Sequence, residues 1–252
     1  MSPPVSILIT GASSGLGAGL AQAYARPGTA LFLSGRDAAR LEAVAEACRA
    51  LGAESHTSIT DVTDAAAVAR WVEASHQRQP LDLVIANAGI SGGTFGGAES
   101  AEQTRAIFAV NVDGVVNTIM PAIALMREQG RGQVAIMSSL AAFRGFPGAP
   151  AYGASKAAVR LWGEGLRGLV ADDGIRVSVI CPGFVTTPMT AVNTFAMPFL
   201  MDVERAVEII TAGLARNRGR IAFPWPMHVL ARMAGCLPSA WMDAIAQKMP
   251  KK

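Results

Sequence analysis

The chain has 252 residues, enough for one large α/β domain with a well-developed core. Apolar residues make up 51% of the chain and charged residues only 16%, a balance that indicates extensive burial, including burial between subunits. The net charge of +3 comes from scattered basic residues with no Lys/Arg run interleaved with aromatics, so nucleic-acid binding is not indicated.

Short β-branched or apolar runs alternate with longer helical stretches along the chain. Their continuous apolar character predicts buried parallel strands over residues 5–10, 30–35, 81–87, 133–139 and 175–183, with shorter strands near 54–60 and 219–224. Helices are predicted over 37–52, 64–78 and 101–128, with Gly52 and Gly130 as C-terminal caps of the first and third. This alternation predicts a doubly wound, Rossmann-like α/β fold, with helices on both faces of the sheet, in one domain over 1–252.

The first predicted strand runs directly into the turn "TGASSGLG", residues 10–17. Gly11, Gly15 and Gly17 permit a tight turn and allow a pyrophosphate to approach the backbone where the next helix begins. Three glycines in a turn can also be purely structural. Their place after a buried strand and before a helix favours a phosphate-binding turn.

The second predicted strand ends in "SGRD", where an acidic residue would bind the ribose 2′-hydroxyl of NAD. The chain has Arg36 instead, whose guanidinium can bind a 2′-phosphate through charge-assisted hydrogen bonds. Alternatively, Arg36 caps a loop or pairs with Asp37. The missing acid favours NADP as the cofactor.

"YGASK" places Tyr152 four positions before Lys156, on one face of a predicted helix. An adjacent ammonium lowers the pKa of a phenol, which is near 10 when unperturbed. The pair alone does not distinguish an acid–base device from a chance combination. The rest of the chain has to decide between them.

Seven short motifs occur in a fixed order: "TGASSGLG", "DVTD" (61–64), "ANAG" (86–89), "NVDG" (111–114), "SS" (138–139), "YGASK" and "PGFVTTPM" (182–189). From residue 5 to about 190 the chain resembles the short-chain dehydrogenase/reductase family in its compact form. The resemblance implies a nicotinamide-dependent oxidoreductase. It also implies a homodimer or homotetramer formed through the helix that begins near Tyr152 and the helix before it.

The resemblance also implies the site residues. The catalytic set is Asn111, Ser139, Tyr152 and Lys156; Ser139 rather than Ser138 is the match, because it precedes the tyrosine by thirteen positions. The implied cofactor-binding residues are Gly11, Ser13, Ser14, Gly15, Leu16, Gly17, Arg36, Asp61, Val62, Asn87, Ala88, Gly89, Tyr152, Lys156, Pro182, Gly183, Val185 and Thr187.

Chemical reasoning assigns roles to this set. Hydride transfer to a carbonyl requires a proton for the oxygen, which Tyr152 can supply if Lys156 lowers its pKa. Ser139 can donate a hydrogen bond to the developing alkoxide. Asn111 is expected to hold a water behind Lys156, or else to be a helix-interior residue bonded to backbone.

Two segments are expected to cover the substrate: residues 140–150 and a lid over about 184–202. Ser139, Phe143, Phe146, Met189 and Phe195 are the predicted substrate contacts, although several of these side chains could instead fill core or interface. No charged residue occurs between Phe184 and Leu200, which favours a small apolar carbonyl or alcohol substrate. The divergent C-terminal tail, about 225–252, is expected to pack on its own domain or a subunit, with a membrane-surface contact as the alternative.

The remaining signals are mostly exclusions. Cys48, Cys181 and Cys236 form no CxxC motif and suit reduced thiols in the cytoplasm, and the dispersed histidines do not indicate a metal site. We find no signal peptide and no apolar run long enough to span a bilayer. The sequence therefore predicts an NADP-dependent oxidoreductase acting on an apolar carbonyl or secondary alcohol. The alternatives are a non-catalytic NADP-binding sensor or scaffold and, within enzymes, lyase or epimerase chemistry.

Overall fold

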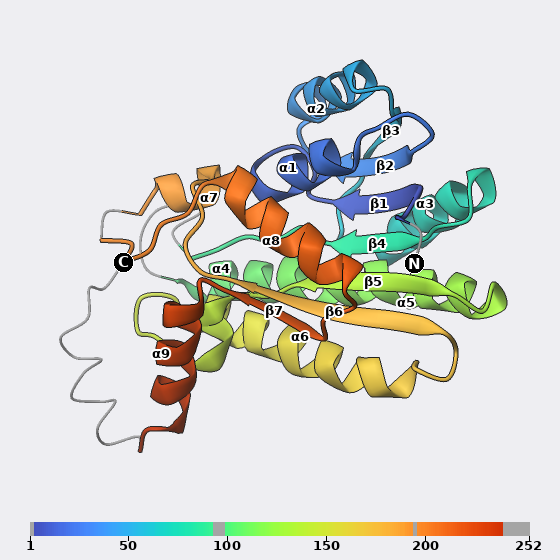
Figure 1. Ribbon diagram of the computed structural model, residues 1–252. Helices are drawn as coiled ribbons and strands as arrows, with labels where there is room; N and C mark the ends of the chain where they lie inside the picture. Colours follow the sequence, from blue (N-terminus) through green and yellow to red (C-terminus); the bar gives the residue numbers. More distant parts are fainter. Residues whose placement is uncertain (1–2, 93–98, 194–195, 239–252) are drawn as a thin grey trace.

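The computed structural model describes residues 3–92, 99–193 and 196–238. Within them, seven parallel strands form one sheet in the order β3-β2-β1-β4-β5-β6-β7, with helices on both faces (Figure 1). The predicted doubly wound, Rossmann-like sheet is confirmed. The strands are β1 (Ser6–Thr10), β2 (Ala30–Gly35), β3 (Glu54–Ile59), β4 (Leu83–Ala86), β5 (Gly132–Met137), β6 (Ile175–Pro182) and β7 (Arg220–Phe223). The helices are α1 (Gly15–Tyr24), α2 (Ala38–Ala50), α3 (Ala65–Arg78), α4 (Ala101–Phe108), α5 (Gly114–Glu128), α6 (Pro150–Leu169), α7 (Pro188–Ala191), α8 (Val203–Ala215) and α9 (Trp225–Cys236).

Alternating side chains of β1 divide the core into two layers. Ile7 and Ile9 are in the apolar cluster that includes residues of α1, α2 and α8, whereas Leu8 is in the cluster that includes residues of α3, α5 and α6. All three side chains are fully buried. Successive residues of a strand point to opposite faces, so a continuous apolar run fits a sheet covered on both sides.

The predicted helix over 101–128 is interrupted. A π-helical turn, Ala109–Asp113, separates α4 from α5 and contains the buried Asn111. Among the described residues, one helical stretch, Ala101–Glu128, is long and apolar enough by length and composition to cross a membrane, with a mean hydropathy of 1.5 in an 18-residue window. Length and composition alone carry little weight here, because residues such as Ile119 pack in the core.

Local signals in the sequence account for several helix ends. Asp37, Asp64 and Ser100 accept a backbone hydrogen bond from the third residue after them and cap α2, α3 and α4. Gly52 and Gly130 follow α2 and α5 with φ angles of 90° and 66°, the left-handed conformation that glycine adopts without strain. Both predicted C-terminal caps are confirmed.

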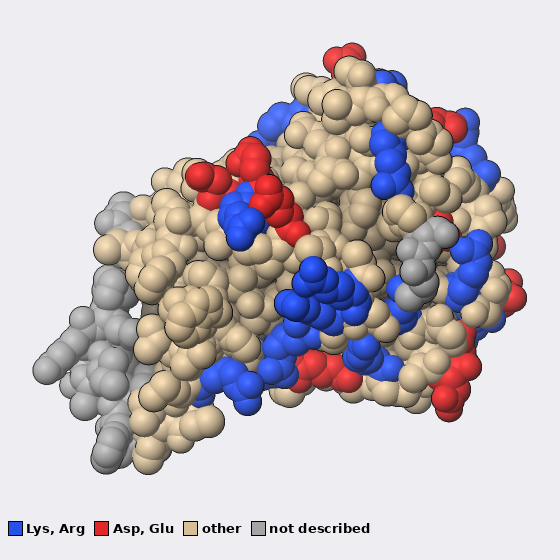
Figure 2. Space-filling view, in the orientation of Figure 1, with Lys and Arg blue, Asp and Glu red and all other residues tan. Residues whose placement is uncertain are grey.

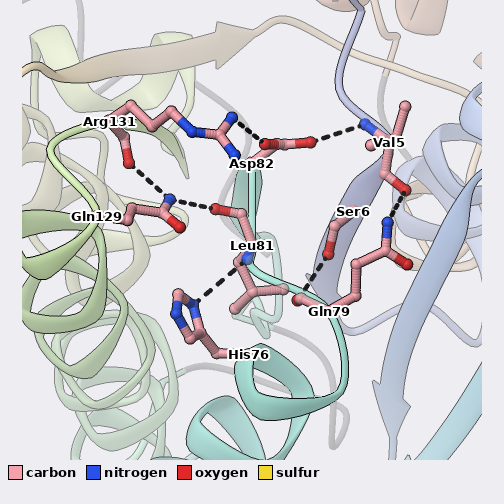
Figure 3. Close-up of polar contacts among 8 residues, drawn as sticks. All are labelled: Val5, Ser6, His76, Gln79, Leu81, Asp82, Gln129 and Arg131. Atoms are coloured by element: carbon pink, nitrogen blue, oxygen red, sulfur yellow. Dashed lines mark hydrogen bonds and ion pairs between the residues drawn. The ribbon is translucent and has the colours of Figure 1, made fainter.

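A network of side-chain hydrogen bonds ties the chain together at the amino ends of the central strands (Figure 3). The Asp82 carboxylate, just before β4, accepts from the Val5 backbone N–H at 3.0 Å and from Arg131 Nη1 at 2.9 Å. Ser6 Oγ donates to the Gln79 carbonyl at 3.1 Å. The network joins the chain that enters β1, β4 and β5.

One face of the molecule has a group of basic side chains over the end of α8 and β7 (Figure 2). Arg216 and Arg218 are exposed there. Arg220 makes a 2.6 Å ion pair with Glu164 of α6, which partly neutralises the group. Residues 239–252 of the predicted tail lie outside the described residues. The homodimer or homotetramer stays a prediction.

Candidate active site

A cavity of about 650 Å³ opens at the carboxyl ends of β1, β2, β4, β5 and β6. It lies across the point where the strand order reverses, between β1 and β4, which is the usual ligand site of this sheet type. Of the predicted cofactor-binding residues, those that line the cavity are Gly11, Ser13, Ser14, Gly15, Leu16, Arg36, Asp61, Val62, Asn87, Ala88, Gly89, Tyr152, Lys156, Pro182, Gly183, Val185 and Thr187.

The Gly-rich turn presents the start of α1 to this cavity. Gly11 and Gly15 have φ angles of 66° and 53°, which other residues rarely adopt. The N-cap residue Ser14 makes no side-chain hydrogen bond to the helix, so no N-cap side chain occupies its first N–H groups. Gly17 lies behind the turn: a Cβ there would be 2.2 Å from the Gly11 carbonyl oxygen. The turn therefore suits a bound phosphate, and Gly17 serves its packing.

Asn87 fixes the shape of this turn from the end of β4. Its side-chain amide donates to the carbonyls of Thr10 and Gly11, each at 3.0 Å. The backbone N–H groups of Asn87 and Ala88 both donate to Thr10 Oγ1, at 3.0 and 3.1 Å. The two connections that flank the cavity are thus joined to each other.

At the end of β2, Arg36 is exposed and lines the cavity. The alternative that Arg36 pairs with Asp37 is wrong, because Asp37 caps α2 and binds Arg40 Nε at 2.7 Å. The charge of Arg36 contributes to lowering the pKa of Asp61, after the larger effect of the hydrogen bond from the Thr63 backbone. Arg36 makes no hydrogen bond within the described part of the chain, so its guanidinium is available to an anion.

Lys156 is 3% exposed and lies at the inner wall of the cavity. Its Nζ donates to the Met137 carbonyl at 2.9 Å, and its own carbonyl accepts from Ser138 Oγ at 2.8 Å. Burial lowers the pKa of this ammonium from 10.5 to about 8, and the neighbouring Cys181 acts in the opposite direction. The lysine is positioned by contacts at both ends of the residue.

Tyr152 and Ser139 line the same part of the cavity. Lys156 Nζ lies 5.9 Å from the centroid of the Tyr152 ring. The expectation that the ammonium lowers the pKa of this phenol is not what the structure shows. Burial raises the pKa of Tyr152, and a hydrogen bond with Ser139 is what opposes the rise. Burial disfavours the charged phenolate, and this effect outweighs the hydrogen bond with Ser139.

Asn111 lies behind this group and does not line the cavity. Its amide exchanges two hydrogen bonds with the Ile90 backbone, of 2.8 and 2.9 Å, and donates to Ser155 Oγ at 3.0 Å. The interpretation as a buried residue bonded to backbone therefore fits the described contacts. The hydrogen bond to Ser155 connects the π-helical turn to α6.

The predicted substrate contacts are distributed unevenly. Ser139 and Met189 line the cavity. Phe143 and Phe146 are not among its lining residues. The Phe143 ring packs against the guanidinium groups of Arg160 and Arg220, at 4.7 and 5.6 Å from its centroid. Phe195 lies outside the described residues.

The predicted lid has a closed base. Thr186 N donates to the Met201 carbonyl at 2.9 Å, and Met201 N donates to the Phe184 carbonyl at 3.1 Å. Beyond this base, Phe199 is 54% exposed. The covering role of this segment stays a prediction.

Several cavity residues were not predicted from the sequence: Asp37, Arg40, Thr60, Ile90, Val110, Met137, Ser138, Pro188 and Thr190. Most of them are neighbours of predicted residues at strand ends, a position that could have indicated them. Arg40 is different, since it reaches the cavity from the first turn of α2. No short motif marks it.

Comparison with known proteins agrees with this geometry. The family model described as short chain dehydrogenase matches residues 6–196. An uncharacterized oxidoreductase from Myxococcus xanthus is 41% identical over 243 residues, covering 96% of each chain. This chain belongs to the short-chain dehydrogenase family.

Solved structures show the same fold. A short-chain dehydrogenase from Sphingobium yanoikuyae in complex with NADPH has a TM-score of 0.81 and 26% identity, covering 97% of this chain and 96% of that one. A short chain dehydrogenase/reductase from Burkholderia phymatum in complex with NAD has a TM-score of 0.81 and 24% identity, covering 98% and 96% of the chains. The chain is thus an oxidoreductase of a family whose members include NADPH and NAD complexes.

Proposed function

We propose that the protein is an NADP-dependent oxidoreductase that interconverts an apolar carbonyl and its alcohol, with Tyr152 as the acid and base. The observation that carries the proposal is that Tyr152, Ser139 and Lys156 line the same cavity, with Tyr152 close to both of the others. Binding a dinucleotide alone does not require that set. A phenol hydrogen-bonded to a serine and near a buried ammonium is suited to proton transfer.

The residues present fit a nicotinamide dinucleotide. The pyrophosphate would lie at the start of α1, where Gly11 and Gly15 adopt left-handed φ angles and Ser14 leaves the first N–H groups free of a side-chain cap. When bound, the cofactor supplies or accepts the hydride.

In the reductive direction, the Tyr152 hydroxyl donates its proton to the substrate oxygen. The raised pKa keeps this phenol protonated at neutral pH, which is the form that donation requires. The phenolate left behind is stabilised by its hydrogen bond with Ser139 and by the positive charge of Lys156. In the oxidative direction, the same phenolate accepts the alcohol proton.

The preference for NADP rests on the end of β2. Asp37, the acidic residue after this position, is already engaged by Arg40 and by the start of α2. Arg36 is exposed beside it without a hydrogen bond in the described chain, and an arginine suits a 2′-phosphate. The proposal of an apolar substrate is based on the absence of charged residues between Phe184 and Leu200.

The test is steady-state turnover with NADPH and a series of unbranched methyl ketones of increasing length. Each additional buried CH₂ is worth about 0.8 kcal/mol, so kcat/KM should rise about fourfold per carbon and then level off. Met197 is an apolar residue of the predicted lid, and Met197→Ala should flatten this rise. A preference for anionic or polyhydroxylated carbonyls would contradict the proposed substrate class.

The cofactor is tested with Arg36→Ala. The change should reduce kcat/KM for NADPH by about tenfold or more and leave that for NADH nearly unchanged, because a charge-assisted contact to the 2′-phosphate is lost. Arg49→Ala is the matched control, since Arg49 is an exposed arginine of α2 that pairs with Glu42. A wild-type preference for NADH would refute the NADP assignment, and NADPH binding without any turnover would favour a sensor.

A further inference from the structure

The helix that carries Tyr152 begins without a cap of its own. Its N-cap residue is Ala149, which has no hydrogen-bonding side chain, and its first residue is Pro150, which has no N–H. The first N–H groups that need an acceptor are therefore those of Ala151 and Tyr152. The start of α6 depends on an acceptor from elsewhere in the chain.

Glu99 provides that acceptor from a distant part of the sequence. Its Oε2 accepts from the Ala151 N–H at 2.6 Å, and its Oε1 accepts from the Tyr152 N–H at 3.2 Å. The carboxylate thus binds two successive N–H groups in the first turn of α6. A negative charge at this end of a helix also complements the helix dipole.

The place of Glu99 makes this contact a link between two elements of the site. The next residue, Ser100, caps α4, and α4 leads through the π-helical turn to Asn111. Asn111 in turn donates to Ser155 of α6. Two contacts, one at the start of α6 and one a turn later, connect this helix to the same segment.

The carboxylate occupies a confined position. A Cβ at Gly92 would lie 2.7 Å from Glu99 Oε1, so a larger residue at position 92 would displace the carboxylate. Ala151, one of its two partners, is buried against Ile90 and Ile107. The surrounding packing thus limits where the carboxylate and the start of α6 can move.

We propose that Glu99 is a positioning residue for proton transfer: its carboxylate fixes the first turn of α6 and thereby the place of the Tyr152 hydroxyl. The inference rests on the proposed role of Tyr152. Lys156, one turn later, has its own contacts to Met137 and Ser138. Loss of the Glu99 carboxylate should therefore disturb Tyr152 and leave Lys156 and the cofactor turn in place.

The experiment compares Glu99→Ala with Glu102→Ala in the whole chain. Misplacing a reacting group by about 1 Å can cost about 100-fold in rate, so kcat in Glu99→Ala should fall by about 10- to 100-fold. The Kd for NADPH should remain within about twofold, since the phosphate turn and Lys156 are unchanged. Glu102, an exposed acid three residues along the chain, is the matched control and should retain full kcat.

A rescue variant separates positioning from a general loss of structure. Ala149→Asp places an acceptor at the N-cap of α6, where it can bind the Tyr152 N–H. Added to Glu99→Ala, it should restore most of kcat. Glu99→Gln, which keeps one strong acceptor oxygen, should be intermediate.

Hydrogen exchange gives a readout that does not need turnover. The amides in the first turn of α6 should exchange faster in Glu99→Ala than in the wild type, while those of β1 should not change. Unchanged exchange, a kcat within about twofold of wild type, or a loss of kcat and NADPH affinity together without rescue by Ala149→Asp would overturn the inference. Tyr152→Phe in the same assay separates the two proposals: normal turnover in that variant refutes the proposed function, whereas an inactive Tyr152→Phe beside an active Glu99→Ala refutes only the role of Glu99.

Discussion

The two ends of the parallel sheet differ in how far their polar groups are paired by hydrogen bonds. At the amino end, Asp82 accepts hydrogen bonds from Val5 and Arg131, and most groups around it are paired with one another, with the buried Gln129 Oε1 as an exception (Figure 3). At the carboxyl end, the start of α1 has no side-chain cap and Arg36 has no hydrogen bond in the described chain. Burial there also disfavours the charged form of Lys156.

This difference indicates where the fold is built for stability and where it is built for a ligand. Polar groups in the interior normally satisfy one another, and those left without partners are common at functional sites. The three predictions below test the contrast, from the largest expected effect to the smallest. We expect substitutions at the carboxyl end to lower kcat, and a substitution at the amino end to lower only the free energy of unfolding.

Tyr152→Phe should produce the largest effect. The variant keeps the ring and removes only the hydroxyl, so kcat should fall by about 10²- to 10⁴-fold, the usual contribution of a general acid. The free energy of unfolding should change by less than about 1 kcal/mol, because the ring still fills its place. Steady-state kinetics and urea denaturation measure the two quantities. A near-normal kcat would remove Tyr152 from the mechanism.

The sequence predicts most of what depends on local pattern. Strand-like runs between helical stretches predict the seven strands, and the spacing of Gly11 and Gly15 predicts a tight turn before α1, because both patterns act through backbone conformation and burial. The cavity forms where these strand ends meet. Their predicted residues therefore line it together.

Contacts between distant residues could not be predicted in this way. Glu99 binds N–H groups more than fifty positions later in the chain, and nothing near it in the sequence distinguishes it from an exposed acid. Phe143 follows Ser139 closely in the sequence, yet it packs against two arginines from α6 and β7. Tertiary packing determines where the Glu99 and Phe143 side chains lie, and no short sequence pattern indicates these contacts.

Lys156→Met should abolish most turnover and at the same time stabilise the protein. Removing a buried ammonium and leaving an apolar chain of similar length should raise the free energy of unfolding by about 1–3 kcal/mol near neutral pH. The pKa of Lys156 is about 8 in the folded protein, against 10.5 for the free side chain. Between about pH 8 and 10.5, the unfolded chain binds more protons than the folded one at this residue. The free energy of unfolding of the wild type therefore rises with pH in this range.

The stability advantage of Lys156→Met should therefore shrink at high pH. Urea denaturation at about pH 7 and about pH 9.5 measures the change. Tyr152→Phe is the control, because it alters the same site without removing a cation. An advantage that is equal at both pH values, or a loss of stability near neutral pH, would show that burial of the ammonium is not the destabilising feature.

Asp82→Ala should have the smallest effect, confined to stability. The change removes the acceptor of the Val5 N–H and the partner of Arg131, which should lower the free energy of unfolding by about 1–2 kcal/mol. The Arg131 side chain is 67% exposed, so Arg131→Ala alone should cost less than about 1 kcal/mol and shows how much of the loss comes from the ion pair. Because the network lies at the opposite end of the sheet from Tyr152, kcat should remain within about twofold of wild type. An Asp82→Ala variant with a wild-type free energy of unfolding but a low kcat would contradict this comparison. A contact at the amino end would then affect catalysis and not stability.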